Sequence, residues 1–437
     1  MTTPINPPKS SGNLAVLVLL AGLVGAGSGL VAALFRLALQ HAEHWRNTLI
    51  AWAQGWPMIG FLTVVFLLAG AAALAAWLVR RFAPQASGSG IPHVEAVVNG
   101  ELPPASPILL PVKFFGGWLA IGGGLALGRE GPCVQMGATI AALIGKIFRC
   151  DTADGIALAA AGAGAGLATA FNAPLAGAVF VLEELVRRFD TRIAIAALAA
   201  SGAAIAVARV LLGEAPDFLL APIAAPHLGA GFLFFLLGLV AGLVGVAYNR
   251  TLVGALAVAD RLSRWPVELR AALVGAAVGV IAWFAPGWVG GGDALTQAAL
   301  AGLAASATVP LIFALRFVLG AGSYAAGTPG GLFAPMLVLG AQLGLLFGSG
   351  CHLAWPALEV LPTAFAVVGM AAFFTSVVRA PLTGIILVAE LTGNSTLLLP
   401  MLIACAAAMT IPTMLGNRPI YDTLKERMLQ PDPTGKR

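Results

Sequence analysis

The chain has 437 residues, of which 10% are charged and 59% are hydrophobic. Average soluble domains carry about 25% charged residues, so this chain lacks the polar side chains that a water-exposed surface requires. Composition therefore excludes soluble enzymes, nucleic-acid-binding proteins and secreted disulfide-rich domains as descriptions of the whole chain. The net charge of +5 indicates no nucleic-acid partner, because membrane proteins collect Lys and Arg at their cytoplasmic ends.

Long uncharged apolar segments recur along the chain. A segment of about 20 apolar residues is long enough to cross the bilayer as a helix. The segments are 14–35, 51–79, 155–182, 218–249, 271–292, 317–358, 360–378 and 391–417. They predict an all-α polytopic membrane protein. The first segment lacks a signal-peptide cleavage pattern, so we interpret it as a retained transmembrane helix.

Other apolar segments are too short to span a membrane. The stretch 131–145 ends at Lys146, and 380–389 ends at Glu390. Short segments interrupted by Gly and Pro predict broken or re-entrant helices. Such helices are tolerated at membrane depth only where they are buried in protein or line a cavity.

The sequence also contains an internal repeat. Residues 171–177 read FNAPLAG and residues 378–384 read VRAPLTG. In both copies a glutamate follows ten positions after the Ala of A-P-L, at Glu183 and at Glu390. Repeated halves with discontinuous helices are typical of transporters whose site lies between the halves. The repeat alone does not decide whether the halves are inverted.

Ionisable residues inside apolar segments are costly, and each is a functional candidate. They are Lys113, Arg129, Glu130, Glu183, Glu184, Asp293, Arg316, Arg379 and Glu390. We expect Arg316, Arg379 and Glu390 to pair within the protein and to hold broken helices. Lys113 has two interpretations, a positive potential near an anion path or a structural salt bridge.

The densest group of such residues is GREGP at 128–132. Glycines on both sides of Glu130 predict an exposed turn or the start of a helix. Helix N-termini carry free N–H groups and a partial positive charge, so they bind anions. A carboxylate there can occupy an anion site and leave it when protonated. The alternative is a capping glutamate paired with Arg129.

Two further glycine turns and one tyrosine complete the pattern. GSGIP at 88–92 offers the Ser89 hydroxyl, and GGLFAP at 330–335 offers consecutive N–H groups. Tyr421, taken alone, is more typical of a membrane-interface anchor. Together these turns predict a dehydrated anion site made of dipoles and hydroxyls. Such a site suits a weakly hydrated monovalent anion better than phosphate, which favours Arg forks.

In this order the motifs resemble the CLC family of chloride channels and proton/chloride exchangers, and their spacing is most like that of the bacterial exchangers. The matching segments are GSGIP (88–92), PVKFFGG (111–117), GREGPCVQ (128–135), FNAPLAG (171–177), GTPGGLFAP (327–335), RAPLTG (379–384) and PIY (419–421). The resemblance implies two inverted-topology repeats with broken and re-entrant helices. It also implies a homodimer with one anion pathway in each subunit.

The resemblance further implies roles for individual residues. Ser89 and Tyr421 would donate hydroxyl hydrogen bonds to a central chloride, and the N–H groups of Leu332 and Phe333 would complete its site. Glu130 would be the external gating glutamate. It would block the pathway when ionised and carry the proton when neutral.

An internal proton-transfer glutamate is also implied. The family pattern places that role on Glu184, the second of two adjacent glutamates. His93 stands where the bacterial exchangers often carry an acid, and this departure bears on proton entry and local charge.

The predicted organisation is a polar N-terminal segment (1–13), a transmembrane domain (14–420) and a short cytoplasmic tail (421–437) without regulatory nucleotide-binding domains. The repeat halves are roughly 14–215 and 216–420. Basic residues cluster directly after Glu184 and again from Arg418 onward. The positive-inside tendency places both clusters, and both termini, in the cytoplasm. We expect a bacterial inner-membrane protein with chloride, protons and lipid as partners and with no metal or cofactor.

The leading hypothesis is coupled antiport of chloride and protons. A passive voltage- or pH-gated chloride channel of the same fold is the first alternative, since channels and exchangers share most motifs. An intramembrane serine hydrolase is the second, because His93 lies four residues after Ser89. Pro92 intervenes and the usual sequence setting of a nucleophilic serine is missing, so we expect no enzyme.

Overall fold

The structure is a computed structural model that describes residues 12–224, 226–304, 307–355 and 361–430. Most of the predicted segment 1–13 lies outside these residues. The helices are α1 (Leu14–Ala53), α2 (Pro57–Phe82), α3 (Ile91–Val98), α4 (Leu109–Gly122), α5 (Glu130–Ile147), α6 (Thr152–Phe171), α7 (Pro174–Phe180), α8 (Thr191–Leu212), α9 (Gly231–Arg261), α10 (Val267–Phe284), α11 (Asp293–Leu300), α12 (Val309–Ala325), α13 (Phe333–Ala354), α14 (Pro362–Val378), α15 (Pro381–Thr392), α16 (Leu398–Met414) and α17 (Ile420–Leu429). Within the described ranges, seven helices are long and apolar enough to cross a membrane. The prediction of an all-α membrane protein is confirmed.

The elements repeat in order, so that α1–α8 correspond to α9–α16. The short helices α3 and α11 both begin after a glycine in the left-handed region, at Gly90 (φ 82°) and Gly292 (φ 95°). The helices α6 and α14 both end at a left-handed residue, Asn172 and Arg379. Packing repeats as well, since α5 packs on α6 as α13 packs on α14. The structure therefore contains two repeats.

The two halves are inverted, as the contact between α7 and α15 shows. Glu183 lies just beyond the end of α7 and accepts hydrogen bonds of 2.9 and 2.6 Å from two N–H groups in the first turn of α15. Glu390 lies near the end of α15 and accepts bonds of 3.1 and 2.8 Å from two N–H groups in the first turn of α7. Because each helix end meets the other helix's start, equivalent helices run antiparallel. Glu390 thus holds a broken helix, as predicted, but through backbone N–H groups.

Glycines let equivalent helix pairs approach closely. A Cβ on Gly162 of α6 would collide with the carbonyl oxygen of Gly137 on α5. In the second half, a Cβ on Gly369 of α14 would collide with the carbonyl oxygen of Gly340 on α13. Small residues at such crossings are how membrane helices pack backbone against backbone. These glycines are needed for space and not for their conformational freedom.

Substituting Gly369 with alanine should therefore destabilise the protein. Forcing a methyl group into a packed crossing costs about 1–3 kcal/mol. Gly322 on α12 is the matched control, because a Cβ there has no atom within 4 Å. Thermal unfolding of the two purified variants in detergent gives the comparison. Equal melting temperatures for G369A and G322A would contradict the close crossing.

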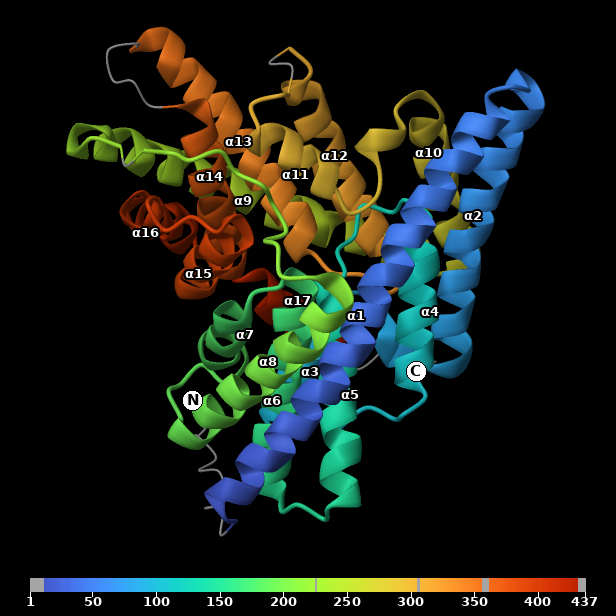
Figure 1. Cartoon of the computed structure of the whole chain (residues 1–437). Coiled ribbons are helices and arrows are strands. Elements are labelled where there is room, and N and C mark those ends of the chain that lie inside the picture. Colours follow the sequence, from blue (N-terminus) through green and yellow to red (C-terminus); the bar gives the residue numbers. More distant parts are fainter. Residues whose placement is uncertain (1–11, 225, 305–306, 356–360, 431–437) are drawn as a thin grey trace.

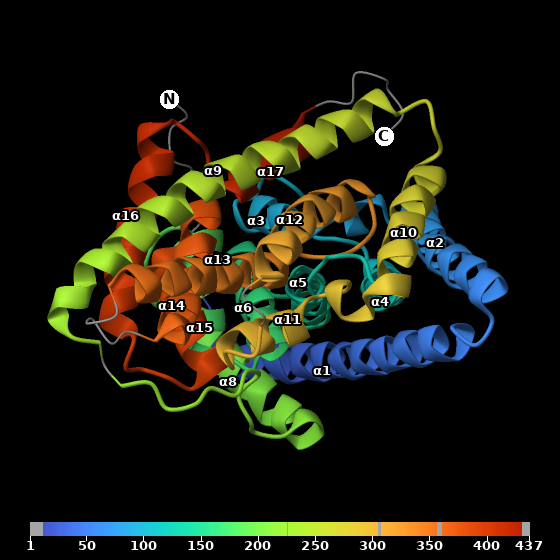
Figure 2. The ribbon, with the colours of Figure 1, turned by 90° about the horizontal axis from the view of Figure 1, so that it is seen from above.

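The last helix returns to the boundary between the halves. In Figure 1 the first-half helices α3, α5, α6, α7 and α8 lie below the second-half helices α11–α14, with α17 between the two groups. Figure 2 shows α1 and α9 running along opposite sides of the molecule. The segment predicted as a cytoplasmic tail from residue 421 thus begins inside α17, and Tyr421 is fully buried.

Candidate anion site between the halves

Three glycine turns that are far apart in sequence are joined by backbone hydrogen bonds. The N–H groups of Gly128 and Gly331 each donate to the other's carbonyl, at 2.8 and 2.7 Å. Gly88 donates to Thr328 at 3.0 Å and accepts from Gly330 at 3.0 Å. The helices α3, α5 and α13 start directly after these turns. Their N-termini, which attract anions, therefore meet at the boundary between the halves.

Glu130 is the first residue of α5, as its setting predicted, but it is fully buried and not exposed. Its Oε1 accepts a hydrogen bond of 2.6 Å from the N–H of Phe333 and a longer one of 3.4 Å from Ala334. Its Oε2 has no hydrogen-bond partner among the described residues. The side chain thus places a carboxylate at the N-terminus of α13, where the sequence predicted an anion.

The glycines around Glu130 make room for its carboxylate. A Cβ on Gly128 or on Gly331 would collide with the carboxylate oxygens, and a Cβ on Gly131 would meet the Ser89 side chain and backbone. None of these three glycines has a positive φ. The motif GREGP therefore needs glycine for close approach between the two turns and the acid.

Two hydroxyl groups are buried without a partner. The Oγ of Ser89 and the Oη of Tyr421 make no hydrogen bond with described residues. Buried hydroxyls are usually paired, so both are suited to donate to a ligand. The Tyr421 ring lies 6.1 Å from the Phe333 ring. The structure thus brings together Ser89, Glu130, Phe333 and Tyr421, and Leu332 is the residue directly before α13.

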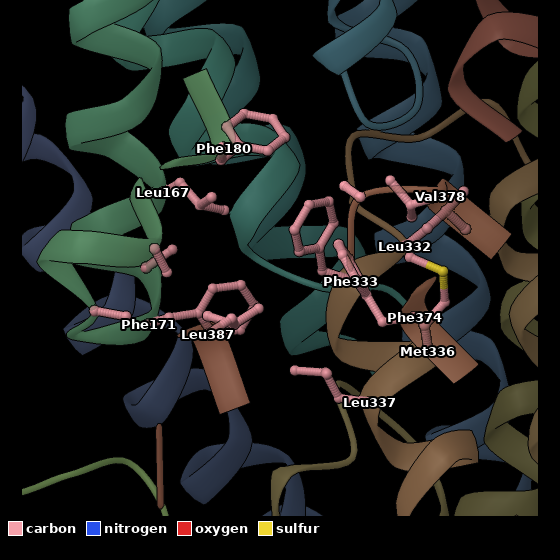
Figure 3. Close-up of a cluster of buried hydrophobic side chains, with 14 of the residues drawn as sticks. Leu167, Phe171, Phe180, Leu332, Phe333, Met336, Leu337, Phe374, Val378 and Leu387 are labelled. Atoms are coloured by element: carbon pink, nitrogen blue, oxygen red, sulfur yellow. The ribbon is translucent and has the colours of Figure 1, made fainter. Parts of the chain in front are cut away.

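Aromatic side chains from both halves surround this position. Figure 3 shows Phe171 and Phe180 in one cluster with Phe333 and Phe374. The Phe333 ring lies 6.2 Å from that of Phe171, 5.8 Å from that of Phe180 and 4.6 Å from that of Phe374. Apolar walls exclude water and strengthen the interaction of N–H dipoles with an anion.

Lys113 supports the turn that carries Ser89. Its buried ammonium donates to the carbonyl oxygens of Ala86 and Gly88, at 3.0 and 2.8 Å. The described residues give it no ion pair, so its charge lies next to the turn without the salt bridge considered from sequence. His93 is buried on α3, and the unpartnered Ser89 Oγ shows that no hydrogen bond joins the two. The hydrolase alternative therefore lacks an activated serine.

A buried ionic network adjoins Glu130. Arg129 does not pair with Glu130; it donates to Asp217 at 2.8 Å and to Asp293 at 2.7 Å. Asp217 lies in the connection between α8 and α9 and also binds Arg36 of α1, at 2.7 Å. Sequence reasoning missed Arg36 and Asp217. The available signal was an arginine directly after the first uncharged segment.

Glu184 lies in a π-helical turn (Val181–Leu185) that continues α7. Its side chain is buried, and its Oε1 is 3.4 Å from a guanidinium nitrogen of Arg187. A cavity of about 680 Å³ is lined by Glu184 and Arg187, among other residues. Because Glu183 caps α15 instead, the two adjacent glutamates have different surroundings.

Arg316 and Arg379, the other two arginines among the sequence candidates, donate hydrogen bonds to backbone carbonyl oxygens. Arg316 is buried and donates to the carbonyls of Gly290 and Gly291, at 2.7 and 3.0 Å. Arg379 donates to the carbonyl of Asn417 at 2.7 Å. Both hold connections between helices, as predicted, but by hydrogen bonds and without an ion pair in the described part of the chain.

The chain is similar to known proteins over most of its length. Residues 70–413 match the family model described as voltage gated chloride channel. The chain is 38% identical over 421 residues to the H(+)/Cl(-) exchange transporter ClcA of Vibrio parahaemolyticus, covering 95% of this chain and 90% of that protein. It is 39% identical over 414 residues to ClcA of Vibrio cholerae, covering 93% of this chain and 88% of that protein.

Solved structures agree with this assignment. A slow cyanobacterial Cl-/H+ antiporter superimposes with a TM-score of 0.92 at 35% identity, over 96% of this chain and 99% of that one. A eukaryotic CLC transporter shares the fold, with a TM-score of 0.83 at 24% identity over 95% of this chain and 74% of that one. The family predicted from the motifs is confirmed, and this chain belongs to the voltage-gated chloride channel (CLC) family.

Proposed function

We propose that this protein is a secondary active transporter that exchanges chloride for protons across a membrane. The observation that carries the proposal is the Glu130 carboxylate on the N–H of Phe333. An ionised carboxylate and a chloride ion make the same demand on a helix N-terminus, so they occupy it in turn. A protonated Glu130 has lost the charge that holds it there and vacates the position. Anion movement is thereby linked to proton movement.

In this proposal the chloride is bound by groups that carry no full charge. The hydroxyls of Ser89 and Tyr421 and the N–H groups of Leu332 and Phe333 donate to it. The two buried hydroxyls without partners support the assignment. Dipolar donors suit an anion that must bind and then leave, because a guanidinium fork would hold it too strongly.

The proton takes a different way to the inside, through Glu184. The carboxylate of Glu184 is buried but lies beside the 680 Å³ cavity, which supports its role as the internal proton-transfer group. Two titratable carboxylates, Glu130 and Glu184, then serve the two ends of the proton route. No metal or cofactor takes part in this scheme.

We propose further that the protein lies in a bacterial inner membrane as a homodimer, with one pathway in each subunit and both termini in the cytoplasm. Light scattering on the purified protein measures the number of subunits. Arg188 and Glu214 are both exposed and lie on opposite sides in this orientation. An impermeant thiol reagent added outside cells should label E214C and spare R188C. The reverse labelling pattern would overturn the orientation.

Proton-coupled transport is tested with purified protein in liposomes. We would impose a chloride gradient, clamp the voltage at zero with a potassium ionophore and record external pH. Sustained uphill proton movement that is absent from protein-free vesicles is the expected result. Chloride flux without proton movement would instead identify a passive channel of the same fold.

A further inference from the structure

One arginine, Arg187, contacts acidic side chains from three separate elements. It follows the π-helical turn, and its backbone has a φ of 54°, a left-handed conformation that is uncommon for a residue other than glycine. One guanidinium nitrogen lies 3.4 Å from Glu184 and 3.8 Å from Glu95 on α3. The same nitrogen is ion-paired with Asp422 on α17. The side chain is 40% exposed, and these ion pairs hold it against the helices.

The sequence position of Asp422 gives this ion pair its significance. Asp422 directly follows Tyr421, whose hydroxyl is a proposed chloride donor. The guanidinium of Arg187 therefore joins the proposed proton-transfer glutamate to the helix that carries part of the chloride site. Among the hydrogen bonds and ion pairs of the described residues, the direct link from Glu184 to Asp422 of α17 is this one side chain.

The charges around Arg187 make its position critical. Three acids face its guanidinium: Glu95, Glu184 and Asp422. Besides Arg187, Lys425 of α17 is a cation in this group, 2.9 Å from Glu95. The Oε2 of Glu95 is buried without a hydrogen-bond partner. With fewer cations than acids, moving the guanidinium toward one carboxylate removes it from another.

Arg187 also lines two cavities. It lines the cavity of about 680 Å³ that contains Glu184. It also lines a second cavity of about 310 Å³, together with Arg418, Asp422, Lys425 and Glu426. The side chain therefore stands where water and protons approach Glu184, and it is attached to the chloride-site helix at the same point.

We infer that Arg187 is a positioning residue that couples the proton step to the chloride step. This inference rests on the proposed roles of Glu184 and Tyr421. A guanidinium offers five donors in a fixed plane, so it can bind Glu184 and Asp422 together. Displacement of α17 as chloride binds or leaves moves Asp422, and Arg187 transmits that movement to the Glu184 carboxylate.

The test compares variants in the liposome assay, with the ratio of chloride to proton flux as the readout. R187Q should lower the proton flux about tenfold, which corresponds to 1.4 kcal/mol, while chloride turnover stays within about twofold. D422N should change the ratio in the same direction, because it frees Arg187 from α17. R187K should restore only part of the coupling, since an ammonium is a single point charge.

Arg188 provides the matched control. It is the next residue on the same exposed loop and lines the same 680 Å³ cavity. R188Q should keep the flux ratio of the unmodified protein. If R187Q lowers chloride and proton flux equally, Arg187 has only a structural role and the inference is overturned. The same conclusion follows if R187Q or D422N leaves the ratio unchanged.

Failure of the proposed function would look different. E184Q should abolish proton movement and keep chloride flux. If E184Q still moves protons, the assignment of Glu184 is wrong, whatever the Arg187 variants do. If E184Q stops proton movement while R187Q and D422N behave like R188Q, the proposed function stands and the inference about Arg187 falls.

Discussion

Replacement of Glu130 by glutamine will stop proton transport and leave a passive chloride flux. Glutamine has nearly the same shape as glutamate but carries no charge and no titratable proton. Its amide oxygen can still accept from the N–H of Phe333, now bonded to Glu130 Oε1 at 2.6 Å, but without a charge it competes only weakly with an anion there. The anion position at the start of α13 is then open at every pH. Proton movement in liposomes should fall to the level of protein-free vesicles.

The control for this variant is E214Q, which makes the same chemical change on an exposed loop residue. It should retain both fluxes and their ratio. Continued uphill proton movement by E130Q would contradict the gating role of Glu130. So would a chloride flux that still falls steeply as the external pH rises.

Replacement of Asp217 by asparagine should give the largest loss of stability. Asp217 and Arg36 both have side chains about 8% exposed, and their charged atoms are 2.7 Å apart. Removing one partner of a buried ion pair leaves an uncompensated charge and costs about 3–5 kcal/mol. Arg36 would retain the carbonyl of Thr169, at 2.9 Å, and an uncharged amide oxygen, but no carboxylate. Chemical unfolding of the purified protein in detergent measures the change.

A double variant separates the effect of the unpaired Arg36 charge from the effect of asparagine at position 217. In R36Q/D217N both charges of the pair are removed, so the loss that comes from an unpaired Arg36 should be recovered, while Arg129 keeps Asp293 as its ion-pair partner. The control is E268Q, since Glu268 pairs with Arg80, whose side chain is 63% exposed. Exposed pairs contribute only about 0–1 kcal/mol. Equal unfolding free energies for D217N and E268Q would contradict the importance of the buried network.

The parts of the site that the sequence predicts are those built from local backbone chemistry. A glycine turn before a helix needs only its own residues, so the starts of α3, α5 and α13 were predictable at 88–92, 128–132 and 330–335. Their convergence was expected from the family resemblance and from the repeat. Burial of Glu130 was not predictable, because it depends on Gly128 and Gly331 meeting across the boundary between the halves.

The ionic network and Arg187 lay beyond sequence reasoning for a different reason. Asp217 lies in a connection between helices, where an aspartate is ordinarily solvent-exposed, and only the fold brings it to Arg36 and Arg129. In the sequence Arg187 is one of the basic residues directly after Glu184, which indicate only orientation. Its contact with Asp422 joins residues more than 200 positions apart, and no local pattern encodes such a pairing.

The reciprocal caps of α7 and α15 also bear on how such a chain arose. In each half, one glutamate accepts hydrogen bonds from the free N–H groups at a helix start in the other half. Two identical single-half polypeptides inserted in opposite directions would satisfy each other in the same way. The arrangement therefore has the self-complementary form of a symmetric two-chain complex, held within one polypeptide. The connection from α8 to α9, which contains Asp217, is what makes the two halves one chain.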